Sequence, residues 1–241
     1  SLELKNITFN IEERKLVDHI SLTMNLGEVV GLLGPNGAGK TTTFNLVIGL
    51  LKPDFGEVSL DGNTISNYSM PLRARFGLGY LPQESSIFRN LSVRENLDLA
   101  LSQSSNSSVL CRLRREQLID EFQLNTFLDR KGYQLSGGER RRCEIARALA
   151  IGSNGPKYLL LDEPFAGIDP IAVSDLQALI KRLSEKGMGI LITDHNVRET
   201  LSITNSSYIL NEGKILAFGP TSQVSNDPLV KRYYLGEGFR L

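Results

Sequence analysis

Two patterns of apolar residues along the chain predict two kinds of β-strand. Residues 2–9 and 20–26 alternate apolar and polar positions, which is typical of half-buried antiparallel strands. Residues 29–33 form a continuous apolar run, as expected for a strand covered on both faces. Similar runs at 158–161 and 189–193 become polar only where they end. We therefore expect an antiparallel start of the chain that leads into a parallel core.

Helical spacing fills most of the chain between these strands. Apolar residues recur every three or four positions from about 40 to 51, from 92 to about 127, after 138 and from 170 to about 186. The second of these stretches belongs to a long segment, residues 85–151, that interrupts the strand pattern. This segment predicts a helical subdomain inserted into the core.

The loop after the first core strand carries the strongest chemical signal. The sequence GPNGAGKT at 34–41 fits G-x-x-x-x-G-K-[ST], the phosphate-binding loop of nucleotide-binding proteins. Its glycines let backbone N–H groups approach an anion, Lys40 adds positive charge, and Thr41 offers a hydroxyl to Mg²⁺. A turn without a ligand would not need so many constrained positions. The predicted nucleotide-binding residues are Gly34, Pro35, Asn36, Gly37, Ala38, Gly39, Lys40, Thr41 and Thr42.

Polar residues follow three other predicted core strands. Gln83 follows a short strand at 76–82, Asp162 and Glu163 end the run at 158–161, and His195 follows the last run. Ligands of open α/β sheets bind at this edge. We expect Asp162, with Thr41 and Gln83, to serve Mg²⁺, and Glu163 to polarise the attacking water. His195 can meet a phosphate oxygen. Taken singly, these residues are ordinary loop and strand-end residues, and the phosphate loop is what favours the functional interpretation.

A second anion site is predicted at 135–139, where the sequence is LSGGE. Ser136 can cap the helix that follows, while Gly137 and Gly138 leave its first N–H groups uncovered. An anion can therefore approach the end of this helix.

The amino-acid composition limits the classes of partner that we expect for this chain. Lys plus Arg equals Asp plus Glu, 27 against 27, so the overall charge gives no support for nucleic-acid or membrane-surface binding. Cys111 and Cys143 lack metal-ligand spacing and indicate no disulfide framework, which favours a reducing, cytoplasmic compartment. With no signal peptide and no membrane-spanning run, we expect membrane association only through another protein.

The order of these motifs resembles the ATP-binding subunits of ABC transporters over essentially the whole chain. The resemblance rests on GPNGAGKTT at 34–42, Gln83, LSGGE, LLLDEP at 159–164, the sequence GID at 167–169, and His195. It implies an α/β fold: a P-loop NTPase core with a mostly parallel sheet, an N-terminal antiparallel β-subdomain and an inserted α-helical subdomain. Residues 1–241 would form one domain, with 1–84 and 152–241 as the core and 85–151 as the helical subdomain.

The same resemblance implies a head-to-tail homodimer that holds two ATP molecules at its interface. One subunit would give the phosphate loop and the other Ser136, Gly137 and Gly138 of its LSGGE segment. Glu163 would be the general base, His195 would contact the γ-phosphate, and Asp169 would couple the two sites. ATP and Mg²⁺ are the implied cofactors. The family stacks adenine on an aromatic residue upstream of the phosphate loop; the matching position holds Ile11, with Phe9 two residues earlier.

Within the family, the chain resembles most the ATPases of lipopolysaccharide export. The segments that carry this resemblance are 75–93, 135–142, 162–171 and 191–201, with the ending YLGEGFRL, where Gly238 departs from the usual acid. The resemblance implies separate transmembrane subunits at the inner membrane, with Phe88 and Arg89 at the docking surface. ATPases of branched-chain amino-acid importers are the alternative. A non-transport ABC ATPase and a P-loop kinase fit less well, since the chain shows no long coiled coil and a kinase has no task for LSGGE.

Overall fold

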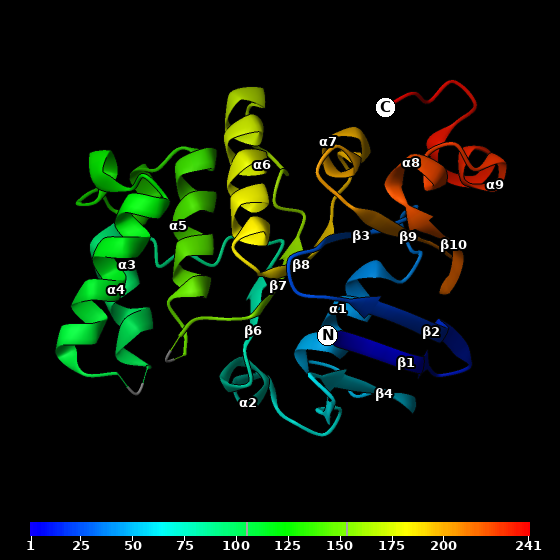
Figure 1. Cartoon of the computed structure of the whole chain (residues 1–241), viewed down its shortest axis with the longest axis horizontal. Helices are drawn as coiled ribbons and strands as arrows, with labels where there is room; N and C mark the ends of the chain where they lie inside the picture. Colours follow the sequence, from blue (N-terminus) through cyan, green and yellow to red (C-terminus); the bar gives the residue numbers. More distant parts are fainter. Residues whose placement is uncertain (105, 153) are drawn as a thin grey trace.

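Two β-sheets form the frame of the molecule in the computed structural model, which describes residues 1–104, 106–152 and 154–241 (Figure 1). The smaller sheet is antiparallel, with the strand order β2-β1-β4-β5. Its strands are β1 (Leu2–Ile11), β2 (Arg14–Met24), β4 (Phe55–Leu60) and β5 (Asn63–Thr64). The predicted antiparallel start of the chain is confirmed, with longer strands than expected.

The larger sheet has the strand order β10-β9-β3-β8-β7-β6. All its neighbouring strands run parallel except β10, which pairs with β9 as an antiparallel hairpin. Every residue of β3, β7 and β8 is buried, which explains why these strands read as continuous apolar runs. The strands are β3 (Val29–Leu33), β6 (Leu78–Leu81), β7 (Tyr158–Asp162), β8 (Gly189–Thr193), β9 (Ser206–Asn211) and β10 (Lys214–Pro220).

Helix α1 (Lys40–Ile48) lies between the two sheets. Its residues Phe44, Leu46 and Val47 join an apolar cluster to which both sheets contribute. The helix is shorter than predicted because Gly49 ends it in the left-handed conformation.

The far end of α1 is held by a buried arginine. Arg73 belongs to α2 (Met70–Arg75), a short helix that the apolar pattern did not predict. Its guanidinium donates to the carbonyl oxygens of Leu46 and Val47, at 2.6 Å each, and to those of Ser66 and Tyr68. A cation placed there complements the negative end of the helix dipole.

The helical insert lies to one side of the larger sheet, away from the antiparallel sheet (Figure 1). Its main helices are α3 (Val93–Ser102), α4 (Ser108–Glu121) and α5 (Gly137–Leu149). The short turns at Asn125–Phe127 and Gly132–Gln134 lie between α4 and α5. Their buried side chains form a single apolar cluster with α6 (Pro170–Glu185) and one face of the larger sheet. The insert therefore shares its hydrophobic core with the sheet.

The C-terminal part packs beside the start of the phosphate loop. It contains α7 (Val197–Leu201), α8 (Thr221–Val224), α9 (Pro228–Val230) and a π-helical turn at Lys231–Leu235. Its apolar side chains gather around Leu33, the last residue of β3. Among the helices of the described residues, none has both the length and the apolar character needed to cross a bilayer.

Candidate nucleotide-binding site

The phosphate loop joins β3 to α1 in a conformation that demands glycine at its first position. Gly34 has a φ of 151°, and a Cβ there would lie 2.2 Å from the carbonyl oxygen of Leu210. The strand neighbour thus leaves no space for a side chain. Asn36, Gly37 and Thr41 are exposed, so the outer part of the loop is open to a ligand.

Lys40 is buried inside this loop, with 8% of its surface exposed. Its Nζ donates to the carbonyl oxygens of Gly34 at 2.7 Å and Pro35 at 3.0 Å. Burial lowers the pKa of Lys40, while the nearby carboxylates of Glu163 and Asp162 raise it. The loop therefore encloses a positive charge that faces two acids, an arrangement suited to a bound phosphate and a cation.

Glu163 brings together the predicted residues from three strand ends. Its Oε2 accepts a hydrogen bond from Gln83 Nε2 at 2.9 Å, and its Oε1 lies 2.9 Å from His195 Nε2. Glu163 is 8% exposed and has a φ of +51°, a left-handed conformation that is uncommon for a residue with a side chain. Such strain is often found at functional sites. The structure thus places the predicted Gln83, Glu163 and His195 in one cluster.

Asp162 has the surroundings of a metal ligand. It is 1% exposed, and within the described chain its Oδ1 has no hydrogen-bond partner, while Oδ2 lies 3.5 Å from the hydroxyl of Tyr80. Burial, reinforced by the charge of Glu163, raises the pKa of Asp162 to about 6. A buried carboxylate oxygen without a partner fits a divalent cation.

The wider donor set favours Mg²⁺ over metals held entirely by protein. The described residues contain no group of three or more His, Cys, Asp or Glu side chains placed to hold a metal ion. Mg²⁺ typically takes one or two carboxylates or hydroxyls and keeps water or substrate phosphates as its other ligands. Asp162, with Thr41 and Gln83 at the same edge, fits that pattern. When bound, the ion would neutralise charge on the phosphates.

Asp194 is a residue of this edge that the sequence analysis did not assign. Its two carboxylate oxygens accept the backbone N–H groups of Phe165 and Asn196, each at 2.8 Å. One bond fixes the turn after Glu163 and the other fixes the turn that carries His195. Burial raises the pKa of Asp194. Only its position at the end of a core strand, beside His195, could have pointed to it.

A groove of about 450 Å³ extends from the phosphate loop toward the antiparallel sheet. It is lined by Arg14, Lys15 and Leu16 of β2, by the loop residues 35–38 and by the hairpin turn at 211–213. Phe9 and Ile11, the predicted adenine contacts, are not among the lining residues. Phe9 packs against the core, whereas Ile11 is 53% exposed and pairs with Arg14 at the end of β1. The groove is therefore lined by β2 and not by the end of β1, and the adenine contact stays a prediction.

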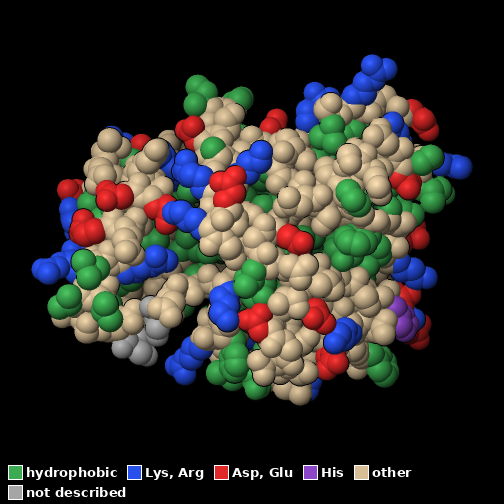
Figure 2. Space-filling view, viewed as in Figure 1, with side chains coloured by type: hydrophobic (Ala, Val, Ile, Leu, Met, Phe, Trp, Pro, Cys, Tyr) green, Lys and Arg blue, Asp and Glu red, His purple; other side chains and the backbone are tan. Residues whose placement is uncertain are grey.

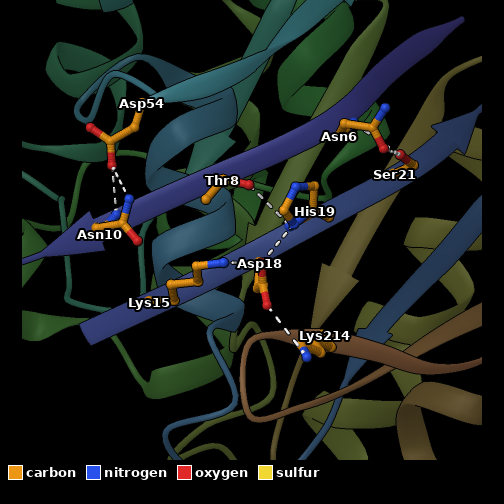
Figure 3. A network of polar contacts seen from close by, with 9 residues as sticks. All are labelled: Asn6, Thr8, Asn10, Lys15, Asp18, His19, Ser21, Asp54 and Lys214. Carbon is orange, nitrogen blue, oxygen red and sulfur yellow. Dashed lines mark hydrogen bonds and ion pairs between the residues drawn. The ribbon is translucent and has the colours of Figure 1, made fainter. Parts of the chain in front are cut away.

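One wall of this groove is braced by a polar network around Asp18, shown in Figure 3. Asp18 accepts from Lys15 Nζ at 3.2 Å and contacts His19 Nδ1 at 2.6 Å, and its second oxygen lies 3.4 Å from Lys214 Nζ. Hydrogen bonds from His19 and Lys15 lower the pKa of Asp18 to about 2. The carboxylate joins β2 to the β9–β10 hairpin, so both walls of the groove are tied together.

The predicted second anion site begins at α5 and has a different setting. Ser136 and Glu139 form a reciprocal capping box: Ser136 Oγ accepts the N–H of Glu139 at 3.2 Å, and Glu139 Oε2 accepts the N–H of Ser136 at 2.9 Å. A Cβ on Gly138 would lie 2.6 Å from Cβ of Ala172, so close packing against α6 also requires glycine here. Glycine at 138 therefore serves helix packing in addition to the predicted access for an anion.

Ser136 and Gly138 line a separate groove of about 130 Å³ together with Asp169, which caps α6. The phosphate-loop residues do not line this groove, and Ser136 and Gly138 do not line the one beside the loop. The two predicted anion sites of one chain therefore lie in different places.

Buried ionic contacts connect α5 to the Gln83 segment. Arg141 donates to the carbonyl oxygens of Gln83 at 2.8 Å and Pro82 at 3.3 Å, and it pairs with Glu144 at 3.0 Å. Glu144 in turn accepts from Ser85 Oγ at 2.7 Å and from the N–H of Ser86 at 2.9 Å. Arg141 therefore anchors the segment after β6 to α5.

Comparison with known proteins decides the family. The model of the ABC transporter family matches residues 17–166. The chain belongs to this family. As a member with the phosphate loop and strand-end residues described above, it is an ATP-binding subunit, an ATPase coupled to transport. The expected α/β fold of ABC ATPases is confirmed by solved cassettes of the same family.

Curated relatives match along the full chain. The "Lipopolysaccharide export system ATP-binding protein LptB" of Haemophilus influenzae is 53% identical over 241 residues, which covers 100% of this chain and 99% of the relative. The protein of the same name from Escherichia coli K12 is 50% identical over 242 residues, with 100% and 99% covered. A "Probable ABC transporter ATP-binding protein" of Azorhizobium caulinodans is 50% identical and covers 95% of this chain and 80% of the relative.

Solved structures of cassettes superpose closely. A nucleotide-free ATP-binding cassette from an ABC transporter gives a TM-score of 0.86 at 30% identity, covering 98% of this chain and 99% of the other. A dimeric cassette in a post-hydrolysis state, bound to ADP and Pi, gives a TM-score of 0.78 at 27% identity, covering 92% and 99%.

Proposed function

We propose that this chain is the ATPase of a lipopolysaccharide exporter. The observation that carries the proposal is the full-length identity of 50 to 53% to proteins named for that system. The chain would act from the cytoplasmic side of the inner membrane, bound to separate transmembrane subunits. Support for this arrangement comes from the relatives named for a lipopolysaccharide export system and from the fold shared with solved ATP-binding cassettes.

We assign a role in ATP binding or hydrolysis to each site residue from its place in the structure. Residues 34–42 hold the phosphates of ATP, and Thr41, Gln83 and Asp162 hold Mg²⁺. Glu163 accepts the proton of the attacking water, while Gln83 and His195 orient its carboxylate through the contacts of 2.9 Å on either side. Residues 85–151 form the helical subdomain that carries the second anion site.

The separation of the two anion sites supports a homodimer with ATP at its interface. Ser136 and Gly138 line a different groove from the phosphate loop within one chain, so a second copy would supply the loop whose γ-phosphate Ser136, Gly137 and Gly138 meet. A structural neighbour of the family is dimeric with ADP and Pi bound. Asp169, beside Ser136, is then placed to couple the two sites.

The dimer can be tested with a variant that binds ATP without consuming it. Glu163→Gln should form a dimer on addition of ATP and Mg²⁺, measured by size-exclusion chromatography with light scattering. Adding Ser136→Arg to that variant should keep ATP binding and abolish the dimer, since a long cation blocks the shared face. If the double variant still dimerises with ATP, the assignment of Ser136 to the partner's nucleotide is refuted.

The docking of the transmembrane subunits is assigned to the segment that follows Gln83. Phe88 is 48% exposed, and the guanidinium of Arg147 lies 4.8 Å from its ring centroid, so the ring is held but remains accessible. Arg89 beside it is exposed. We expect Phe88→Ala or Arg89→Glu to abolish co-purification with the membrane subunits and to leave ATP binding unchanged. Unchanged co-purification would remove this assignment.

The transported substrate has to be identified with the complete transporter and not with the ATPase alone. Affinity purification of the full chain from solubilised membranes should recover its transmembrane partners, and reconstitution of that complex in vesicles should show ATP-dependent release of lipopolysaccharide to an acceptor. Stimulated uptake of branched-chain amino acids would instead support the alternative importer.

Figure 2 shows Lys, Arg, Asp and Glu interspersed on the face it draws, which gives no support for a nucleic-acid partner there.

A further inference from the structure

A single buried carboxylate connects the two turns that carry Glu163 and His195. Asp194 is 2% exposed and directly follows β8, just as Glu163 directly follows β7. The two strands are neighbours in the sheet, and Asp162 pairs with Thr193, so both turns leave the sheet side by side (Figure 1). A side chain at the end of β8 can therefore contact both turns.

The first turn is held by one oxygen of Asp194 at a point two residues after Glu163. The N–H of Phe165 donates to Asp194 Oδ2 at 2.8 Å, and the ring of Phe165 is buried in the apolar cluster that the sheet shares with the helical insert. Glu163 itself has a φ of +51°, and its N–H donates to the carbonyl oxygen of Thr193 at 2.8 Å. A residue with a side chain keeps this uncommon conformation only where its surroundings enforce it. The bond to Phe165 is one of the contacts that do so.

The second turn is held by the other oxygen of the same carboxylate. Asp194 Oδ1 accepts the N–H of Asn196 at 2.8 Å, as in an Asx-turn, and His195 lies between these two residues. The side chain of His195 is 54% exposed, and its Nε2 lies 2.9 Å from Glu163 Oε1. Because much of this side chain is exposed, packing contributes little to its direction, and the backbone of the turn matters more.

The relative position of the two turns thus depends on one rigid, planar group. We propose that Asp194 is a positioning residue for ATP hydrolysis: its carboxylate ties the two turns together and thereby holds the Glu163 carboxylate against the His195 imidazole. The inference rests on the roles proposed above for Glu163 and His195, and it is independent of the transported substrate.

Asp194→Asn in the full chain tests this role. Asparagine has nearly the same shape, but its Nδ2 carries only donor hydrogens, so one of the two backbone N–H groups loses its acceptor. We expect kcat at saturating ATP and Mg²⁺ to fall about tenfold to a hundredfold, since a misplacement of about 1 Å can cost this much. The Kd for a non-hydrolysable ATP analogue should change less than about threefold, because the phosphate loop keeps its contacts. Steady-state ATPase assays and isothermal titration measure the two quantities.

Tyr158→Phe is the matched control for a loss of stability alone. It breaks one side-chain hydrogen bond of a buried residue, from Tyr158 Oη to Asp61 Oδ1 at 2.6 Å, at the opposite end of β7. We expect both substitutions to lower Tm. Only Asp194→Asn should lower kcat, in assays at a temperature at which circular dichroism shows both variants to be folded.

A double-mutant cycle shows whether Asp194 acts through His195. In the His195→Ala background, Asp194→Asn should reduce kcat by a smaller factor than in wild type, because one of the groups that it positions is already absent. If Asp194→Asn does not fold, Asp194→Ser replaces it in every assay. The serine hydroxyl can still accept the N–H of Asn196, but the bond to Phe165 is lost, so kcat should fall here as well.

Wild-type kcat in Asp194→Asn or, in its place, Asp194→Ser would overturn the proposal. So would an equal loss of kcat in Tyr158→Phe, a Kd raised by as large a factor as kcat is lowered, or equal factors in the two backgrounds of the cycle. Wild-type kcat in Glu163→Gln would refute the proposed function itself. Loss of turnover in Glu163→Gln together with full turnover in Asp194→Asn would refute only the role of Asp194.

Discussion

The strand edge and the start of α5 both carry residues expected to meet the phosphates of ATP, and they are built differently. At the strand edge, side chains from separate strands contact one another: Glu163 touches Gln83 and His195, and Lys40 is buried inside its own loop. At α5, the side chain of Ser136 bonds with Glu139 of its own helix. The first region is organised by the chain alone, whereas the second presents a capped helix end that lacks a phosphate loop of its own.

Because of this difference, substitutions in the two regions should have measurable effects in different states of the protein, the monomer and the dimer. Substitutions at the strand edge should alter nucleotide binding or stability in a single chain, and turnover once two chains meet. Substitutions at the helix end should show their main effect only when two chains meet.

The largest expected effect is on turnover at the strand edge. Glu163→Gln should lower kcat about a thousandfold, because an amide cannot accept the proton of the attacking water, while ATP binding is retained. Glu139→Gln is the matched change at α5; Gln also satisfies a capping box, so we expect kcat within about threefold of wild type. Steady-state ATPase assays of both variants check this. Similar losses in the two variants would break the comparison.

The second largest expected effect is on stability, for a substitution of the arginine that holds the C-terminal end of α1, which lies away from the phosphate loop. Arg73→Met should lower the free energy of unfolding by about 2 to 4 kcal/mol, since two buried and two partly buried carbonyl oxygens lose their donor. Burial already lowers the pKa of Arg73 to about 10, yet a protonated guanidinium remains at neutral pH. Urea unfolding measures the change. Arg75→Met, at an exposed position, should stay within about 0.5 kcal/mol of wild type.

Asp162 should make the protein less stable as the pH rises. Its folded pKa of about 6 lies above the ordinary value of 3.8, so the folded state binds the proton more tightly than the unfolded state. The stabilisation is complete below about pH 4 and is lost as the pH rises through 6. Asp162→Asn, which cannot ionise, should therefore be more stable than wild type at pH 7.5 by up to about 3 kcal/mol.

Denaturation in EDTA at pH 4 and pH 7.5 tests this linkage. The advantage of Asp162→Asn should vanish at the lower pH. Equal differences at both pH values would show that the carboxylate is not destabilised by burial. Adding ATP and Mg²⁺ should stabilise wild type and much less the Asn variant, because a carboxylate ligand of the metal has been removed.

The smallest effect in the monomer belongs to the helix end. Ser136→Ala removes an N-cap and should cost about 1 kcal/mol of stability, without changing the Kd of the monomer for ATP. In the Glu163→Gln background the same change should weaken ATP-dependent dimerisation. Isothermal titration and light scattering separate the two quantities. A rise in the monomer's Kd would place Ser136 in the site of its own chain and contradict the division between the regions.

The sequence by itself determined the nature of the two sheets and most of the strand-edge site. Buried parallel strands need apolar residues on both faces, so β3, β7 and β8 were visible as continuous runs with polar residues at their ends. Because the carboxyl ends of parallel strands meet at one edge, the proximity of Gln83, Glu163 and His195 followed from their positions. The phosphate loop could be recognised in the sequence because its geometry demands particular residue types at fixed spacing.

Only the tertiary structure decided which residues surround that edge. Arg14 and Leu16, and not Phe9 or Ile11, line the groove beside the phosphate loop, because the pairing of β1 with β2 sets which strand faces it. Arg73 reaches the end of α1, and Tyr234 packs against the apolar cluster around Leu33, across long stretches of chain. Such contacts depend on how separately formed elements pack, and no local pattern or spacing encodes them.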